Sequence, residues 1–145
     1  MTKLYIDTEF NDFNGPLISM ALVAESGEEF YEVLECSDPS DWVAENVMPI
    51  LAKDPVPREV LQYRLQRFLC KFDTLEIIAD WPEDLKHFCE ILIQGAGICL
   101  YCPPFTLSYR EDLSSIDSKV PHNALHDARA IADEDLSRAY DKGSV

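Results

Sequence analysis

The stretch K-L-Y-I-D-T-E-F, residues Lys3 to Phe10, is the part of the sequence that decides how the rest is interpreted. Its apolar residues predict a buried β-strand that ends in two acids, Asp7 and Glu9. Residues two apart in a strand point to the same face, so the two carboxylates should converge. A divalent cation such as Mg²⁺ or Mn²⁺ would remove their repulsion and the cost of desolvating them. The alternative is a strand that ends in polar residues before a turn.

The composition is that of a single globular domain spanning residues 1–145. Hydrophobic residues make up 47% of the chain, which is enough for one core and argues against disorder. No apolar run approaches the length of a membrane span, and the N-terminus lacks a signal-peptide core. The five cysteines show no disulfide framework, which is typical of a reducing compartment. We therefore expect a cytoplasmic protein without membrane association.

The charge is strongly acidic, with a formal net value of −15. This argues against a protein that coats nucleic acid non-specifically, because such proteins need a basic surface. It is compatible with a metal-dependent enzyme that acts on phosphates, since bound cations reverse the local sign. Arg64, Arg67 and Lys71 form the one basic stripe at helical spacing. Such a stripe is usually a solvated face, and the alternative is a surface for a phosphate backbone or a partner.

The pattern of apolar residues predicts an alternation of strands and helices. Two strands over 17–24 and 29–34 follow short turns and should form an antiparallel meander with the first strand. The later expected elements are helices over 40–51 and 57–72, a strand over 74–79, a helix over 82–94, a strand over 98–101, a long loop over 102–120 and a helix over 123–140. The first helix should bury Trp42, and residues 143–145 should form a frayed tail.

This element order predicts an α/β fold. A three-strand meander that leads into parallel strands with helical crossovers gives a mixed five-stranded sheet flanked by helices. Its layout resembles that of the ribonuclease H-like fold. In such sheets, functional residues gather where strands end and helices begin.

Three segments in order resemble the motifs of the DEDDh 3′–5′ exonucleases. They are D-T-E-F at Asp7–Phe10, I-I-A-D-W-P-E-D at Ile77–Asp84 and H-N-A-L-H-D-A-R at His122–Arg129. The group includes ribonuclease T, oligoribonuclease and the proofreading subunit of bacterial polymerase. The resemblance runs from residue 3 to about residue 140, and the small size is similar to that of compact bacterial and phage exoribonucleases.

The second motif matches the family least closely. Aligning its strand places Asp84 at the catalytic aspartate and Asp80 at a position usually held by asparagine, with Glu83 replacing an aromatic residue. The spacing to Leu85 and Phe88 favours Asp84. The alternative is that Asp80 acts at the strand end while Asp84 caps the helix.

The resemblance implies hydrolysis with two divalent cations, Mg²⁺ or Mn²⁺. Asp7 would bridge both cations, Glu9 and Asp127 would complete the site of one, and Asp84 would hold the second. His122 would accept a proton from the attacking water, because an imidazole titrates near neutral pH. The products would be 5′-mononucleotides released from the 3′ end.

The resemblance also implies a substrate, a single-stranded nucleic acid 3′ end, with RNA preferred over DNA. Family members stack the last bases on apolar or aromatic side chains, and Phe10 is the best candidate to line that pocket. The alternative for Phe10 is a core residue at a strand end. Many members are dimers, so a homodimer is a further expectation. His126 breaks the spacing of the third motif and is interpreted as a surface residue.

Other classes of function remain open at this point. An acidic interaction protein that mimics nucleic acid would explain the net charge, but it would not need acids on a buried strand. A binding module of the same fold that has lost catalysis would not need all five motif residues. A nucleotide pyrophosphatase with a comparable metal site is a third alternative.

Overall fold

The computed structural model describes residues 1–143 and is built around one mixed sheet. The sheet has five strands in the order β3-β2-β1-β4-β7. Their bounds are β1 (Thr2–Phe10), β2 (Leu17–Ala24), β3 (Glu29–Val33), β4 (Leu75–Ala79) and β7 (Phe105–Tyr109). Strands β1 to β3 form an antiparallel meander, β4 is parallel to β1, and β7 is parallel to β4. The expectation of an α/β chain with a mixed five-stranded sheet is confirmed.

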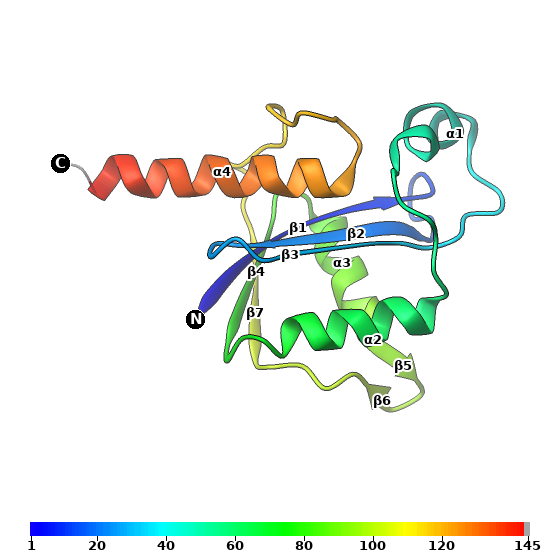
Figure 1. The fold of residues 1–145 in the computed structure, drawn as a ribbon, viewed down its shortest axis with the longest axis horizontal. Coiled ribbons are helices and arrows are strands. Elements are labelled where there is room, and N and C mark those ends of the chain that lie inside the picture. The colour runs from blue at the N-terminus through cyan, green and yellow to red at the C-terminus, as the bar shows by residue number, and fades with distance from the viewer. Residues whose placement is uncertain (144–145) are drawn as a thin grey trace.

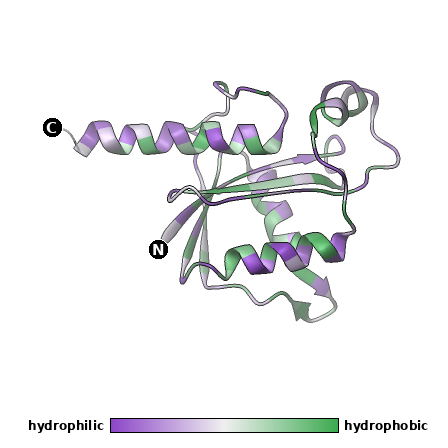
Figure 2. Cartoon of the chain, viewed as in Figure 1, coloured by the Kyte–Doolittle hydropathy of each residue, from purple (hydrophilic) through white to green (hydrophobic). Residues whose placement is uncertain are grey.

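Helices cover both faces of this sheet (Figure 1). One face packs against α4 (Ala124–Gly143), and the other packs against α2 (Arg58–Leu69) and α3 (Pro82–Ile91). The short helices α1 (Asp41–Asn46) and η1 (Met48–Ile50) add a small apolar cluster against β2 and β3. Coloured by hydropathy, α4 carries polar and apolar residues in alternation along its length (Figure 2). Within the described residues, no helix is long and apolar enough to cross a membrane.

The alternation along β1 sorts its side chains between the two helical layers. Leu4 and Ile6 belong to the core beneath α2 and α3, whereas Tyr5 belongs to the core beneath α4. Because side chains alternate in a strand, Asp7 and Glu9 share the α4 face with Tyr5. Thr8 therefore points to the opposite face, towards α3.

The prediction of the fifth strand was wrong in position. The segment expected at 98–101 instead contributes β6 (Ile98–Cys99), which pairs with β5 (Ile93–Gly95) in a separate two-stranded ribbon. The fifth strand of the main sheet is β7, in the segment expected to be a loop. Strand β7 is an edge strand with largely exposed side chains, including Leu107, so its sequence carries little of the apolar signal of a buried strand.

Two helices also differ from their predicted extents. The helix expected over 40–51 divides into α1 and η1, because Pro49 has no N–H and its ring clashes with the preceding turn of an α-helix. Within α1 the buried residue is Val43, and Trp42 is half exposed instead of buried. Helix α4 continues to Gly143, so the predicted tail is shorter than expected, and its last two residues lie outside the described part of the chain.

A buried ionic network fixes α4 to the sheet. The carboxylate of Asp135 accepts a hydrogen bond of 2.6 Å from the Tyr5 hydroxyl and lies 3.5 Å from the Lys3 ammonium and 3.3 Å from the Arg110 guanidinium. Burial alone would raise the pKa of Asp135, but the bond from Tyr5 and the two cations outweigh it and hold the pKa below its usual value. The helix is therefore anchored two turns beyond Asp127.

Replacing this charge should weaken the fold in a pH-dependent way. We expect Asp135→Asn to lower the free energy of unfolding by about 1–3 kcal/mol near neutral pH, as for a buried hydrogen bond to a charged group. Because the folded-state pKa is lowered, the stabilisation is present above the unfolded pKa near 4 and is lost as the pH falls through the folded value. Urea unfolding at several pH values measures this. A deficit equal to that of the exposed Asp133→Asn control would contradict it.

Candidate metal centre

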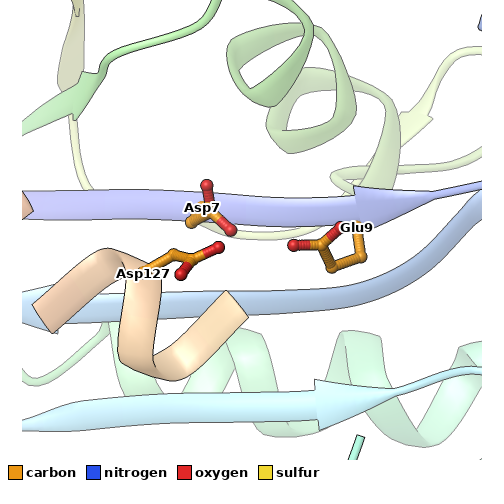
Figure 3. Close-up of side chains that lie close together, drawn as sticks. All are labelled: Asp7, Glu9 and Asp127. Atoms are coloured by element: carbon orange, nitrogen blue, oxygen red, sulfur yellow. The ribbon is translucent and has the colours of Figure 1, made fainter. Parts of the chain in front are cut away.

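Three acids from two elements meet on the α4 face of the sheet (Figure 3). Asp7 and Glu9 come from the end of β1, and Asp127 comes from the first turn of α4. One carboxylate oxygen from each lies within 4.8 Å of the other two, which is close enough to share a cation. Asp7 and Asp127 are buried, and Glu9 is half-buried. The convergence predicted for Asp7 and Glu9 is present.

A second group of acids shares Asp7 with the first. Asp80 directly follows β4, and Asp84 lies in the first turn of α3. Their carboxylate oxygens and one from Asp7 also lie within 4.8 Å of one another. The parallel pairing of β1 and β4 brings these elements together, since the two strands end at the same edge of the sheet. The structure therefore brings both candidates of the second motif to Asp7.

Asp84 is held by β1 and not by its own helix. Its Oδ1 accepts two hydrogen bonds from Thr8, one of 3.1 Å from the backbone N–H and one of 2.6 Å from the hydroxyl. The N-cap of α3 is Trp81, which makes no capping hydrogen bond with its side chain. Asp84 is 2% exposed. These contacts fix the carboxylate at the sheet and leave its second oxygen free to bind a ligand.

Burial raises the pKa values of all five acids, and repulsion from neighbouring carboxylates raises those of Asp7, Glu9, Asp80 and Asp84 further. The pKa of Asp7 lies well above its usual value because of burial and of the charges on its neighbours, Asp84 first among them. Burial, together with Asp127 and Asp84, raises the pKa of Glu9 to about 9. Burial raises the pKa of Asp84 to about 7 against the opposing hydrogen bonds from Thr8, and it also raises the pKa values of Asp80 and Asp127. Such crowding disfavours the charged forms unless a cation compensates.

Two oxygen atoms of the cluster have no protein partner. Asp7 Oδ2 and Asp127 Oδ1 are buried without a hydrogen bond in the described part of the chain. The hydroxyl of Ser118, which is itself buried and unpaired, lies near enough to Asp127 to lower its pKa. Buried polar atoms are nearly always paired, so each such atom needs an explanation. Carboxylate oxygens are the preferred ligands of Mg²⁺ and Mn²⁺, and a cation between these atoms would satisfy both. The donor set therefore fits a divalent cation.

His122 touches the acids through its backbone. Its N–H donates a hydrogen bond of 3.2 Å to Asp127 Oδ2, and its φ of 72° lies in the left-handed region. A non-glycine residue with this backbone conformation is strained, and such strain is concentrated at functional sites. The exposed imidazole packs edge-on against the indole of Trp42, with the ring centroids 5.0 Å apart. His122 is thus placed beside Asp127 at the surface of the molecule.

Phe10 lies on the other side of the sheet from the acids. Its ring is half-buried and packs on the imidazole of His87 in α3, with centroids 4.9 Å apart. The pairing of β1 with β2 shifts between Glu9 and Phe10. His87 is itself 3% exposed, and this burial lowers its pKa. The structure therefore pairs Phe10 with the α3 layer and not with the acidic groups.

The predicted basic stripe also lies away from the acids, on α2 under the opposite face. Arg64 lies 3.0 Å from the carboxylate of the buried Glu32. The Arg67 guanidinium lies 5.8 Å from the centroid of the Tyr63 ring, and the Lys71 ammonium lies over the ring of Phe68. These contacts hold the cations along the helix surface and not at the candidate metal centre.

Sequence reasoning missed two residues that organise this centre. Thr8 holds Asp84 through a hydrogen bond. In the sequence, Thr8 stands out only as a polar, β-branched residue between Asp7 and Glu9, with its side chain on the other face of the strand. Asn123, which is 3% exposed, precedes α4, and its Oδ1 accepts hydrogen bonds from the N–H groups of Leu125 and His126. The signal for Asn123 is that of an ordinary helix N-cap.

No family model matches the chain, and a search of curated proteins finds no match to it.

Neutralising Asp7 should stabilise the cation-free protein. Because the acids have raised pKa values in the folded state, burying them costs least free energy below pH 4, where they are protonated. The free energy of unfolding then falls as the pH rises through the folded-state pKa values, about 7 for Asp84 and about 9 for Glu9. In EDTA near pH 8 we expect Asp7→Asn to raise the melting temperature, by about 2–4 °C per kcal/mol of relieved repulsion. Differential scanning fluorimetry measures the shift.

The same variant should lose its response to cations. Added Mn²⁺ should raise the melting temperature of the wild type and leave that of Asp7→Asn unchanged. The exposed Asp73→Asn is the control and should behave as the wild type in both conditions. A destabilised Asp7→Asn in EDTA would show that the carboxylate is a structural hydrogen-bond acceptor and not a crowded ligand.

Proposed function

We propose that this protein is a metal-dependent 3′–5′ exonuclease that hydrolyses single-stranded 3′ ends, with RNA preferred over DNA. The observation that carries the proposal is the pair of buried acidic groups that share Asp7. One shared carboxylate between two ligand sets is the arrangement expected of a two-cation hydrolase. The element order and the mixed sheet support a ribonuclease H-like fold of the DEDDh exonuclease type.

Each acid has a role in this proposal. Asp7 would bind both cations, Glu9 and Asp127 would complete one site, and Asp84 would complete the second. When bound, the two cations would stabilise negative charge on the attacking and leaving oxygens of an in-line displacement. The hydrogen bonds from Thr8 to Asp84 and from the His122 N–H to Asp127 orient these carboxylates before any ligand arrives.

His122 is the proposed general base. It would take a proton from the attacking water, a role that suits an exposed imidazole beside an acidic cluster. Trp42, which is half exposed and touches the His122 ring, offers an aromatic surface at the same place. Unpaired bases stack on such rings, whereas the bases of a duplex are not free to do so, and this favours a single-stranded substrate.

An acidic protein that mimics nucleic acid is the second candidate, and the net charge of −15 favours it. A mimic would display its acids on an outer face. Here Asp7, Asp84 and Asp127 are buried, at a cost that surface recognition does not require. The exonuclease therefore accounts for the placement of the acids better than the mimic does.

The direct test is digestion of 5′-labelled single-stranded RNA and DNA oligomers of one sequence. With Mg²⁺ or Mn²⁺ we expect a ladder that shortens from the 3′ end, faster for RNA, and no products in EDTA. Asp7→Asn should remove the activity, and Asp73→Asn should retain it. If well-folded protein cleaves neither polymer with either cation, the exonuclease proposal fails and the acidic interaction protein takes its place.

The two candidates of the second motif can be separated by paired variants. Asp84→Asn should abolish cleavage, because Asp84 is the buried carboxylate that Thr8 orients towards Asp7. Asp80→Asn should reduce cleavage by only about 10–100-fold, as expected for a group that supports a metal ligand without binding the cation. Turnover of both variants is compared with Mn²⁺ affinity measured by calorimetry. The reverse ranking would assign the second cation to Asp80.

A further inference from the structure

Asn123 forms more contacts than the capping of α4 requires. Its Oδ1 accepts the N–H groups of Leu125 and His126 at 3.1 and 3.2 Å, which satisfies the first turn of the helix. Its Nδ2 points to another element and donates a hydrogen bond of 2.9 Å to the carbonyl oxygen of Ile50 at the end of η1. One side chain therefore links the start of α4 to η1.

Tyr31 of β3 strengthens this link. Its hydroxyl donates a hydrogen bond of 2.7 Å to the carbonyl oxygen of Leu51 and accepts a longer one of 3.5 Å from Asn123 Nδ2. Leu51 is buried with Val43 and Val47, so α1 and η1 pack on the sheet as one unit. The position of this unit relative to α4 is thus set by hydrogen bonds from Asn123 and Tyr31 at its end.

The two segments joined by Asn123 carry the two rings that meet beside the acids. Trp42 belongs to α1, and His122 directly precedes Asn123 in the chain. Their contact buries little surface, since both side chains remain exposed. The ring contact therefore has weak support of its own and depends on how the two segments are held.

We propose that Asn123 is a positioning residue that holds Trp42 against His122 and so fixes the imidazole beside Asp127. The catalytic part of this inference rests on the proposed function, in which His122 is the general base. The structural part, a tether between η1 and α4 that sets the Trp42–His122 contact, stands on the hydrogen bonds alone. Small displacements of a catalytic group are enough to cost large factors in rate.

Asn123→Ser removes the hydrogen bond to Ile50 while keeping the helix cap, and so tests the two roles of Asn123 separately. Serine is as good an N-cap as asparagine, so α4 should keep its first turn. Its hydroxyl ends one bond short of the amide nitrogen and is already used by the cap, so the bond to Ile50 is lost. The change is neutral and adds no charge to the acidic centre.

The structural part is measured by fluorescence. Trp42 and Trp81 are the two tryptophans of the chain, so a Trp81→Phe background leaves Trp42 as the single reporter. In this background we expect Asn123→Ser to increase the acrylamide quenching constant of Trp42 by about twofold, as its ring separates from His122. Tyr31→Phe should shift the quenching in the same direction by less.

The catalytic part is measured by steady-state cleavage of a single-stranded RNA oligomer. We expect Asn123→Ser to lower kcat on the order of tenfold, with KM and the Mn²⁺ affinity changed by less than about twofold. Gln62→Ser is the matched control. It removes another buried amide that ties two backbone carbonyls, those of Ile91 and Ile93, on the opposite side of the sheet. Its kcat and its Trp42 quenching should remain those of the wild type.

The outcomes distinguish this inference from the proposed function. If Asn123→Ser leaves Trp42 quenching unchanged, the tether is not what holds the ring and the inference is overturned. If quenching rises while kcat is unchanged, the positioning of His122 is overturned. If the wild type cleaves no nucleic acid, the proposed function fails, while the fluorescence still decides the structural part.

Discussion

The electrostatic cost of burying Asp7 among other carboxylates is the constraint on which this structure depends. Burial and four neighbouring acids all raise its pKa, and one of its oxygens has no protein partner. A fold can retain such a group only if its stability comes from elsewhere. Strand β2 is buried over its whole length, and helices cover both sheet faces, so the core supplies that stability. The cost is concentrated in the acids that surround the end of β1, where the proposed function requires it.

The same constraint explains why α4 is fixed at two points. Asp127 must reach acids that precede it by more than a hundred residues, and a helix free to rotate would carry its carboxylate away from them. Asp135 ties the helix to Tyr5 of β1, and Asn123 ties its start to η1. Asp127 lies between the two anchors on the buried side. The position of the Asp127 carboxylate is therefore set by hydrogen bonds of Asp135 and Asn123, which lie outside the acidic groups.

Local patterns in the sequence predicted most of the fold and the members of the acidic groups. The strands from β1 to β4 are dense in apolar residues, and the convergence of Asp7 and Glu9 follows from strand spacing. Asp127 was predicted only through the resemblance of the third motif to an exonuclease motif. The exposed edge strand β7 carries no such pattern, and Pro49 divides a helix whose apolar spacing continues past it. The contacts of Thr8 and Asn123 could not be predicted, because a hydrogen bond between distant segments leaves no periodic signal. The structure brings both Asp80 and Asp84 to Asp7, and beyond the apolar spacing that favours Asp84 the sequence pattern carries no signal that separates the two.

The C-terminal part of α4 extends past the sheet as an exposed rod (Figure 1). At 1.5 Å per residue, the helix places its last turn roughly 24 Å from Asp127. Tyr140, which is 78% exposed, marks this outer part. The distance is suited to energy transfer or paramagnetic relaxation between a probe on the rod and a Mn²⁺ ion or a labelled oligonucleotide at the acids. A probe placed on this part of α4 would therefore report distances to the candidate centre from a position fixed by the helix itself.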